Sequence, residues 1–522
     1  MPASVLDRCG PGGFRYLYES GVVYANAHHR HANTETIVGH TTLATGADPA
    51  DHGMIGNVWF DKQLGRAVYN IEDDRYSLLS DEVGVDKSTE KDPTLKVATS
   101  DGRSPRAILT STFSDELALS TNGQAKIFAV SVKDRGAVPM SGRAGKAFWF
   151  SKATGGFVSS TYYYDAYPAW VKEWNTQSLA QSYANTSWEL LRDKSTYRFG
   201  HDDDMPWEVS LPGFGRVFPH PFGKAESKLF TSLLTLSPVG DELTLSFAKE
   251  LIVQEGLGKD AITDYLAISF SSTDYVGHVF GPSSLESEDN LLRLDKTLAD
   301  LFGYIDKQVG LDNTLIILSA DHGAPEVPGR LHQLGFDARY FNPDSLEKQK
   351  VIQTLKAKYG LATELISGYH HPYLYLNNEA LKKRKLNIHE VSQAIAAALP
   401  NISGIAYAVP SIDIREGKIP DTRMYRQILR NFNPKRSGDI YIVFEPHCFI
   451  NDFDGLTVAS AHGSPWRYDT YVPIIFAGNG LKPQTVFREV ETVDVALTLS
   501  NYLRVNAPSG ATGNPLAEVL AK

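Results

Sequence analysis

One threonine in a segment rich in glycine and histidine has the surroundings of a nucleophile. Thr36 lies in residues 33–40, which read NTETIVGH. A hydroxyl attacks well only when a neighbouring base or a metal ion lowers its pKa. Residues 37–44 predict a short helix, whose free N–H groups in the first turn favour an anion. The sequence therefore predicts that Thr36 attacks a phosphate group held at the start of this helix.

Aspartate and histidine residues further along the chain supply candidate metal ligands. Asp274 and His278 are four positions apart, Asp321 and His322 directly follow an apolar run, and His462 precedes another. Carboxylate and imidazole groups without thiolates suit zinc or a similar divalent ion in a catalytic site. Each element alone is more often a capping or packing arrangement. Their common position next to predicted strands favours a metal site.

Other histidines lack such partners. Residues 28–31 read HHRH but contain no carboxylate, so we expect a solvated loop or the rim of a pocket rather than a metal site. His370, His371 and His447 have no carboxylate at ligand spacing either. These three are predicted to be structural.

Apolar runs rich in β-branched residues predict five buried parallel strands, at 126–132, 265–270, 314–320, 439–444 and 471–477. Apolar stripes with helical spacing predict a helix that begins near Glu286 and two more around 391–399 and 493–503. This alternation predicts an α/β fold with a mostly parallel sheet sandwiched by helices. Because ligands bind beyond the carboxyl ends of such strands, residues that directly follow a strand are expected at the site. Those residues are Lys133, Asp274 and Asp321.

The bulk properties limit the classes of function. The chain has 522 residues, a formal net charge of -10 and a pI near 5.9, which argues against broad binding to nucleic acid or membrane surfaces. Two cysteines exclude a disulfide scaffold. No run has the length of a transmembrane helix, and the first residues lack the pattern of a signal peptide. We expect one domain over residues 1–522, with inserted caps at about 145–235 and 330–438.

The combined pattern resembles the alkaline phosphatase superfamily. It runs through residues 34–57, Asp274-x3-His278, Asp321-His322-Gly323 and His462-Gly463. Within that superfamily the chain is most similar to the threonine-nucleophile alkaline phosphatases of the PafA type, which are related to nucleotide pyrophosphatases/phosphodiesterases. The resemblance covers nearly the whole chain. It implies a single alkaline phosphatase-like α/β domain.

The resemblance implies two zinc ions per chain. One would be held by Asp274, His278 and His462, and the other by Asp321, His322 and the Thr36 oxygen. The phosphate ligands are implied in the same way: Asn57 matches a phosphate-contacting asparagine, and Lys133 with Arg135 matches the Lys-x-Arg element of the monoesterases. A phosphate monoester has two negative charges and a third bare oxygen for these two cations, whereas a diester has a second organic group there.

The implied function is hydrolysis of small phosphate monoesters through a covalent phosphothreonine on Thr36. We expect a monomer with broad specificity. The alternative within the superfamily is a phosphodiesterase or nucleotide pyrophosphatase, against which Lys133 and Arg135 argue. The aromatic residues of the first cap could stack on a nucleobase or simply form a core.

Relatives in the superfamily have one further zinc ligand, an aspartate at the end of a first strand, and its expected place is a few positions before Met1. Two explanations compete. In the first, the protein begins upstream of Met1 and is longer, exported and active; in the second, the fold lacks its first strand and the second metal site has one carboxylate fewer. We favour the first, because every other site residue is in place. A site with one carboxylate fewer would hold metal more weakly and leave Thr36 less acidic, so an inactive phosphate- or metal-binding homologue is the third alternative. The resemblance also implies a periplasmic or secreted protein.

Overall fold

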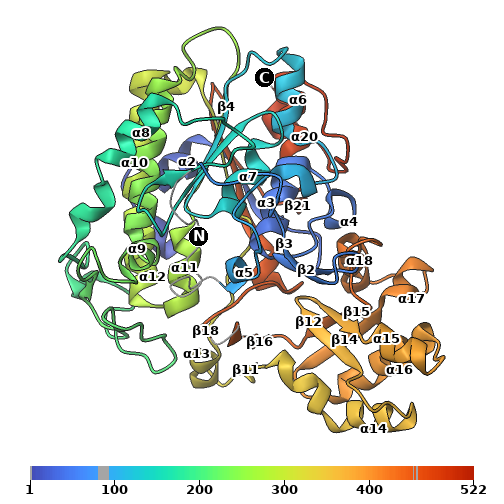
Figure 1. Cartoon of the computed structure of the whole chain (residues 1–522). Helices are drawn as coiled ribbons and strands as arrows, with labels where there is room; N and C mark the ends of the chain where they lie inside the picture. Colours follow the sequence, from blue (N-terminus) through green and yellow to red (C-terminus); the bar gives the residue numbers. More distant parts are fainter. Residues whose placement is uncertain (1–2, 80–92, 451, 454–455, 522) are drawn as a thin grey trace.

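Two β-sheets form the centre of the body (Figure 1). The computed structural model describes residues 3–79, 93–450, 452–453 and 456–521. The first sheet has the order β6-β5-β4-β9, and the second has the order β10-β19-β1-β20, with β21 also paired to β1. Their strands are β1 (Val22–His28), β4 (Ile127–Ser131), β5 (Lys146–Phe150), β6 (Phe157–Val158), β9 (Tyr265–Ser269), β10 (Leu315–Ser319), β19 (Tyr471–Gly478), β20 (Gln484–Val486) and β21 (Val490–Glu491).

Helices cover both faces of this layer, because the strands carry apolar side chains on both faces. On one face Ile316 and Leu318 pack against α2 (Phe14–Ser20), α10 (Pro238–Gln254) and α12 (Leu285–Gln308). On the other face Leu315 and Ile317 pack against α6 (Phe113–Ser120) and α20 (Asp494–Leu503). The predicted α/β sandwich is confirmed, including the helix that begins near Glu286.

Two of the predicted strands differ from expectation in direction or place. β19 runs antiparallel to both of its neighbours, β1 and β10. The strand at 439–444 is β15 (Ile440–Phe444), and it belongs to a separate antiparallel sheet of order β12-β13-β15-β14. An apolar run indicates that both faces of a strand are buried, but it does not determine the partner or the direction of pairing.

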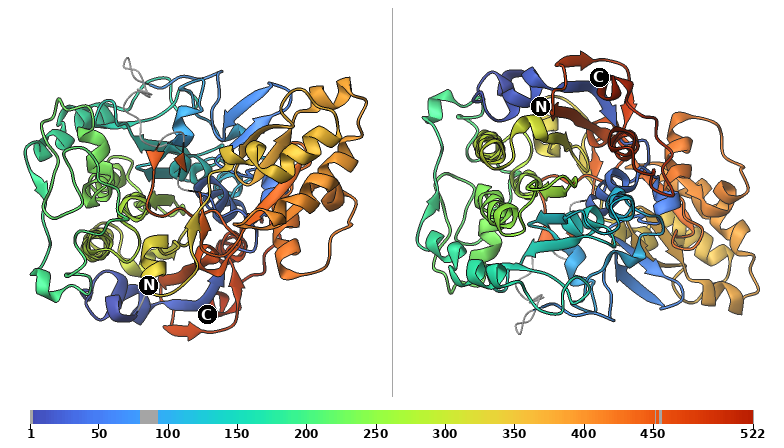
Figure 2. Two further views of the ribbon diagram at one scale, coloured as in Figure 1. Left: turned by 90° about the horizontal axis from the view of Figure 1, so that it is seen from below. Right: turned by 90° about the horizontal axis from the view of Figure 1, so that it is seen from above.

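The separate sheet anchors a unit beside the body, shown in yellow to orange (Figure 2). It contains β12 (Ile366–His370), β13 (Tyr373–Leu376), β14 (Ile405–Pro410), α14 (Lys350–Lys358) and α16 (Ile388–Ala398), which share one apolar core. This unit falls within the second expected cap. The start of the first expected cap contains β5 and β6, and these strands belong to the central layer. No helix in the part of the chain that the structure describes could cross a membrane.

The two central sheets end at strands with free edges. Among the described strands, β9 pairs only with β4 and β10 only with β19. All residues of β9 and β10 are only half-buried although both strands are apolar, whereas every residue of β4 is buried. Both strands nevertheless pack on the same core cluster.

The free edges predict a difference in amide hydrogen exchange within the 522-residue chain. We expect Tyr265–Ser269 and Leu315–Ser319 to exchange faster than Ile127–Ser131 and Tyr471–Gly478, because the latter two strands are hydrogen-bonded on both sides. Exchange followed by mass spectrometry on peptides from each strand makes the comparison. Equal protection of all four strands would show that the edges of β9 and β10 are covered.

Candidate active site

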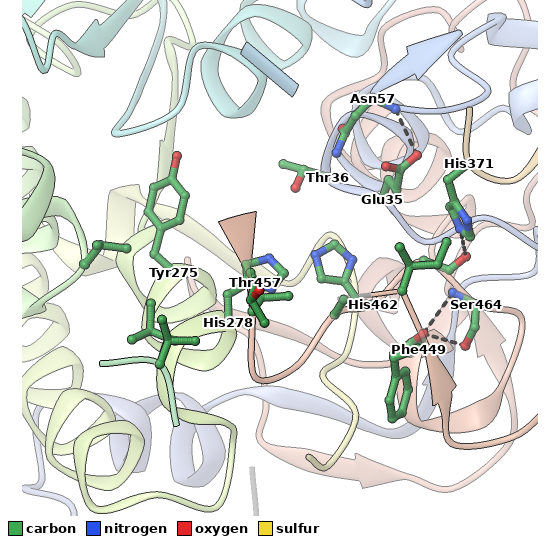
Figure 3. A pocket seen from close by; sticks show the side chains of 18 of the residues that line it. Glu35, Thr36, Asn57, Tyr275, His278, His371, Phe449, Thr457, His462 and Ser464 are labelled. Atoms are coloured by element: carbon green, nitrogen blue, oxygen red, sulfur yellow. Dashed lines mark hydrogen bonds between the residues drawn. The ribbon is translucent and has the colours of Figure 1, made fainter. Parts of the chain in front are cut away.

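Thr36 is the first residue of helix α3 (Thr36–Thr45) and is almost fully buried. The first turn of the helix is held by Asn57, whose Oδ1 accepts a hydrogen bond from the Ile37 amide at 3.2 Å. Glu35 in turn accepts hydrogen bonds from the Asn57 amide at 3.0 Å and from Asn33. In Figure 3 the amide of Asn57 is turned toward Thr36, which faces the rings of His278 and His462. The sequence-predicted hydroxyl and amide therefore lie at one helix start.

A glycine allows α3 to approach the second sheet closely. A Cβ atom on Gly39 would lie 1.8 Å from the carbonyl oxygen of Asp321, the residue that follows β10 by two positions. The next residue, His40, places Nδ1 3.2 Å from the Asp321 carboxylate and Nε2 3.1 Å from Ser269 Oγ on β9. This contact brings the helix that starts at Thr36 against the ends of both β9 and β10.

Three side chains from two segments form the first group of metal ligands. Asp274 and His278 lie one turn apart on α11 (Ser272–Phe280), and His462 lies in the loop before α19 (Arg467–Thr470). His278 Nε2 is 3.3 Å from Asp274 Oδ2, and His462 Nε2 is 3.5 Å from Asp274 Oδ1. One ligand atom from each residue lies within 4.8 Å of the others, and within the described ranges no other group of three or more acidic, histidine or cysteine side chains does so.

The second pair adjoins the first. His322 Nε2 is 3.3 Å from Asp321 Oδ2 and 3.8 Å from Asp274 Oδ1. The rings of His322 and His462 stack with their centroids 3.4 Å apart. His322 Nε2 is buried and has no hydrogen-bond partner among the described residues. A buried nitrogen in this state suits a metal ion, which would accept its lone pair.

The far nitrogens of the three histidines fix the ring orientations. Nδ1 of His278, His322 and His462 lies 2.7, 2.9 and 2.8 Å from the carbonyl oxygens of Ser460, Gly323 and Thr34. A carbonyl oxygen only accepts, so each Nδ1 must carry the proton and donate it. In the neutral ring Nε2 then keeps its lone pair and points toward the carboxylates. Histidines that bind a metal ion through one ring nitrogen almost always donate a hydrogen bond from the other.

The two carboxylates of the site stay ionised because positively charged groups lie beside them. Burial alone would raise the pKa of the Asp274 carboxyl, but His278 and Lys133 hold it well below its ordinary range. At Asp321 burial also raises the pKa of the carboxyl, but the neighbouring His322 and His40 lower it by more. This pKa therefore also lies well below its usual value. Burial lowers the pKa of His322, but the neighbouring Asp321 outweighs it and raises that pKa to about 9. Both carboxylates are therefore anionic and attract positive charge.

Lys133 and Arg135 reach the same place from the first sheet. Lys133 follows β4 and precedes α7 (Asp134–Ser141), and its ammonium group contacts the Asp274 carboxylate. The ammonium group also lies 4.2 Å from the centre of the Tyr275 ring. Arg135 is buried in the first turn of α7 and lines the cavity at Thr36. The start of α7 is anchored by Asp134, which pairs with Arg103 at 2.6 Å.

The prediction for residues 28–31 was wrong. His28, His29 and His31 are buried rather than solvated. His29 Nε2 lies 3.1 Å from the carbonyl oxygen of Ala320, directly before Asp321. Burial lowers the pKa of His31 to about 3, so its ring is neutral. These histidines fill the space behind α3, and their partners come from segments that the local sequence pattern does not indicate.

A cavity opens in front of Thr36 (Figure 3). Five of the predicted site residues line it: Thr36, Asn57, Arg135, His278 and His462. Sequence reasoning missed the remaining walls, which include Lys152, Tyr275 and a set of apolar side chains: Val209, Leu211, Leu236, Val279, Phe444, Phe449, Ile450 and Val458. Only Tyr275 had a signal in the sequence, because it lies between two metal ligands. His371, expected to be structural, also lines the cavity and bonds the Gly463 carbonyl at 2.8 Å.

Comparison with known proteins relates this site to phosphoryl-transfer enzymes. The family profile described as type I phosphodiesterase / nucleotide pyrophosphatase matches residues 1–465. Alkaline phosphatase PhoV of Synechococcus elongatus is 36% identical over 516 residues, which cover 98% of this chain and 89% of PhoV. Alkaline phosphatase PafA of Elizabethkingia meningoseptica is 34% identical over 525 residues, which cover 99% of this chain and 91% of PafA.

Solved structures of PafA agree with the fold. The crystal structure of the wild-type enzyme superposes with a TM-score of 0.87 at 31% identity, covering 99% of this chain and 95% of that one. A PafA variant matches with a TM-score of 0.88 at 31% identity, covering 99% and 96%. In that variant a threonine is replaced by serine, and an asparagine, a lysine and an arginine are replaced by alanine.

The contact between Gly39 and Asp321 predicts that Gly39→Ala disrupts the site. The added methyl group cannot fit, so α3 or Asp321 must move, at a cost of about 1–3 kcal/mol in the free energy of unfolding. We expect zinc affinity, measured by titration calorimetry, to fall at least about tenfold. The matched control is Gly303→Ala, a helical glycine with open space around it. Zinc affinity equal to that of the control would contradict this role of Gly39.

Proposed function

The chain belongs to the type I phosphodiesterase / nucleotide pyrophosphatase family and is a phosphoric monoester hydrolase of the alkaline phosphatase kind, and we propose that it uses zinc and a phosphothreonine intermediate on Thr36. The observation that carries the proposal is the convergence at one helix start of Thr36 with three histidines and two aspartates. These residues come from four distant parts of the chain. Within this group, His278 and His462 face Thr36 (Figure 3).

The ligand set fits two zinc ions. Asp274, His278 and His462 would hold one, and Asp321 and His322 with the Thr36 oxygen would hold the other. The orphaned Nε2 of His322 and the three Nδ1–carbonyl bonds support this assignment. Zinc ions in such a site supply positive charge that lowers the pKa of a hydroxyl and stabilises charge on oxygen.

The residues of the chain can perform the two halves of the reaction. The Thr36 oxygen attacks phosphorus in line, a bond to phosphorus forms, and the bond to the alcohol oxygen breaks. Water then attacks the phosphothreonine from the vacated side, releasing inorganic phosphate and restoring the Thr36 hydroxyl. The free N–H groups at the start of α3 and the amide of Asn57 hold phosphate oxygens during both steps.

Lys133 and Arg135 favour a monoester over a diester. A phosphate monoester offers two negative charges and a third bare oxygen, which two buried cations can bind. Lys133 contacts Asp274 and Arg135 lines the cavity, so both are close to the expected phosphate. The four residues replaced in the PafA variant match Thr36, Asn57, Lys133 and Arg135 in type and in separation along the chain within each pair. This match supports the same roles here.

Some finer features of the protein rest on family membership alone. We infer that its substrates are small phosphorylated compounds, that it acts as a monomer, and that it works in the periplasm or outside the cell. The broad division into one α/β domain with two caps also remains a proposal, although β5 and β6 limit the first cap to the segment after residue 158.

Replacement of Thr36 tests the nucleophile. We expect Thr36→Ala to lower turnover of a nitrophenyl phosphate monoester, with zinc added, by at least about a thousandfold. Thr36→Ser should retain measurable turnover because it keeps the attacking oxygen. Acid quenching of the wild-type enzyme with substrate, followed by mass spectrometry, should find phosphate on the peptide that contains Thr36. An active Thr36→Ala enzyme would refute the mechanism, and lack of turnover in all three proteins would favour a phosphate- or metal-binding role.

The preference for monoesters has its own test. We expect Lys133→Ala and Arg135→Ala each to lower kcat/KM for the monoester by about 10–100-fold, the effect of one lost hydrogen bond to a charged group. Turnover of the corresponding diester should change much less, because a diester lacks the third bare oxygen. A wild-type enzyme that prefers the diester, or variants that lose both activities equally, would favour the phosphodiesterase alternative.

A further inference from the structure

We infer from the cavity that the preferred substrates are phosphate monoesters of apolar alcohols, with an alkyl or aryl group, rather than sugar phosphates or nucleotides. This inference rests on the proposed function, since it places the phosphate at Thr36. The apolar part of the cavity would then bind the alcohol side of the same molecule.

Four separate segments supply the apolar wall. Val209 and Leu211 come from the loop that follows α8 (Ala169–Thr176), and Val279 comes from α11. The remaining side chains come from the segment around β15 and β16 (Cys448–Phe449) and from the turn after β18 (Leu456–Thr457): Phe444, Phe449, Ile450 and Val458. Together with Leu236, these side chains make the lining of the cavity beside Thr36 mainly apolar.

Charged side chains are a minority of the cavity lining. The charged side chains among its described lining residues are Glu35, Arg135, Lys152 and Asp469, and none belongs to the apolar wall. Lys152 lies over the Tyr275 ring at 5.2 Å, beside Lys133 at 4.2 Å from the same ring. The cations therefore lie where the phosphate is expected.

The two carboxylates of the lining, Glu35 and Asp469, already have partners. Glu35 accepts hydrogen bonds from Asn33 and Asn57, and Asp469 accepts hydrogen bonds from Ser464. A second phosphate or a sugar hydroxyl placed against the apolar wall would lose its hydration without gaining a hydrogen bond. An alkyl or aryl group would instead gain from burial.

The wall is preorganised by backbone hydrogen bonds to the helix that carries the metal ligands. The Val209 amide donates to the Val279 carbonyl at 2.9 Å, and the Ala459 amide donates to the His278 carbonyl at 2.8 Å. Both neighbouring wall residues, Val209 and Val458, are therefore fixed relative to His278. Because the wall is already ordered, binding of the alcohol group does not cost conformational entropy in the wall.

Binding of n-alkylphosphonates to the zinc-loaded enzyme tests the wall without turnover. We expect the Kd, measured by titration calorimetry, to fall about fourfold for each methylene added between methyl and hexyl, the effect of burying one methylene group. Val209→Thr and Val458→Thr keep the side-chain shape but add a hydroxyl, so each should weaken hexylphosphonate binding while leaving methylphosphonate unchanged. Val351→Thr is the matched control, because Val351 is a half-buried valine of α14 that packs on the separate core.

Turnover of hexyl phosphate and of glycerol phosphate is measured in parallel. Affinity that does not depend on chain length, or that depends on it equally in all three variants, overturns the inference about the wall. Chain-length-dependent binding with no hydrolysis of either ester supports the wall and refutes the proposed function instead. Faster hydrolysis of hexyl phosphate, lost in Val209→Thr and Val458→Thr, supports both.

Discussion

The burial of two carboxylates at one place is the constraint on which the site depends. Asp274 and Asp321 are half-buried, with side-chain exposures of 18% and 20%, and an unpaired charge in a poorly solvated place is costly. Three histidines, Lys133 and His40 surround them, and the histidines are themselves held by backbone carbonyls. Repulsion between the carboxylates is thus offset by fixed partial and full positive charges. The same arrangement has the ligands that the proposed divalent cation needs, so the groups whose burial lowers stability are those assigned the function.

The fold meets this constraint by bringing strand ends together. β4, β9 and β10 lead into Lys133, Asp274 and Asp321 respectively, and both sheets are covered by the same helices. Gly39 then allows α3 to contact the backbone of Asp321 directly, which a larger residue would prevent. The position of Thr36 follows from this contact rather than from any property of the threonine itself. One glycine therefore links the sheet to the nucleophile.

Much of the site could be predicted because strand ends can be recognised in the sequence. Apolar runs in the sequence predicted β4, β9 and β10. The polar residues that follow these strands lie close together in the structure. The antiparallel direction of β19 could not be predicted, because an apolar run has the same composition in either direction. The burial of His29 was missed, since its partners Ala320 and Thr492 lie far along the chain. The apolar wall was missed for a similar reason: no single segment contributes enough of it to form a pattern.

The apolar wall also bears on the chemistry. One of its residues, Val279, belongs to α11, the helix that carries Asp274 and His278. An alcohol group seated there would exclude water from the side of the reacting phosphorus that it covers. Electrostatic interactions strengthen where water is excluded, so the cations beside Thr36 would act more strongly on a phosphate whose alcohol fills the wall. Recognition of the alcohol and stabilisation of the transferring phosphoryl group would therefore depend on each other, although the residues responsible come from several parts of the chain.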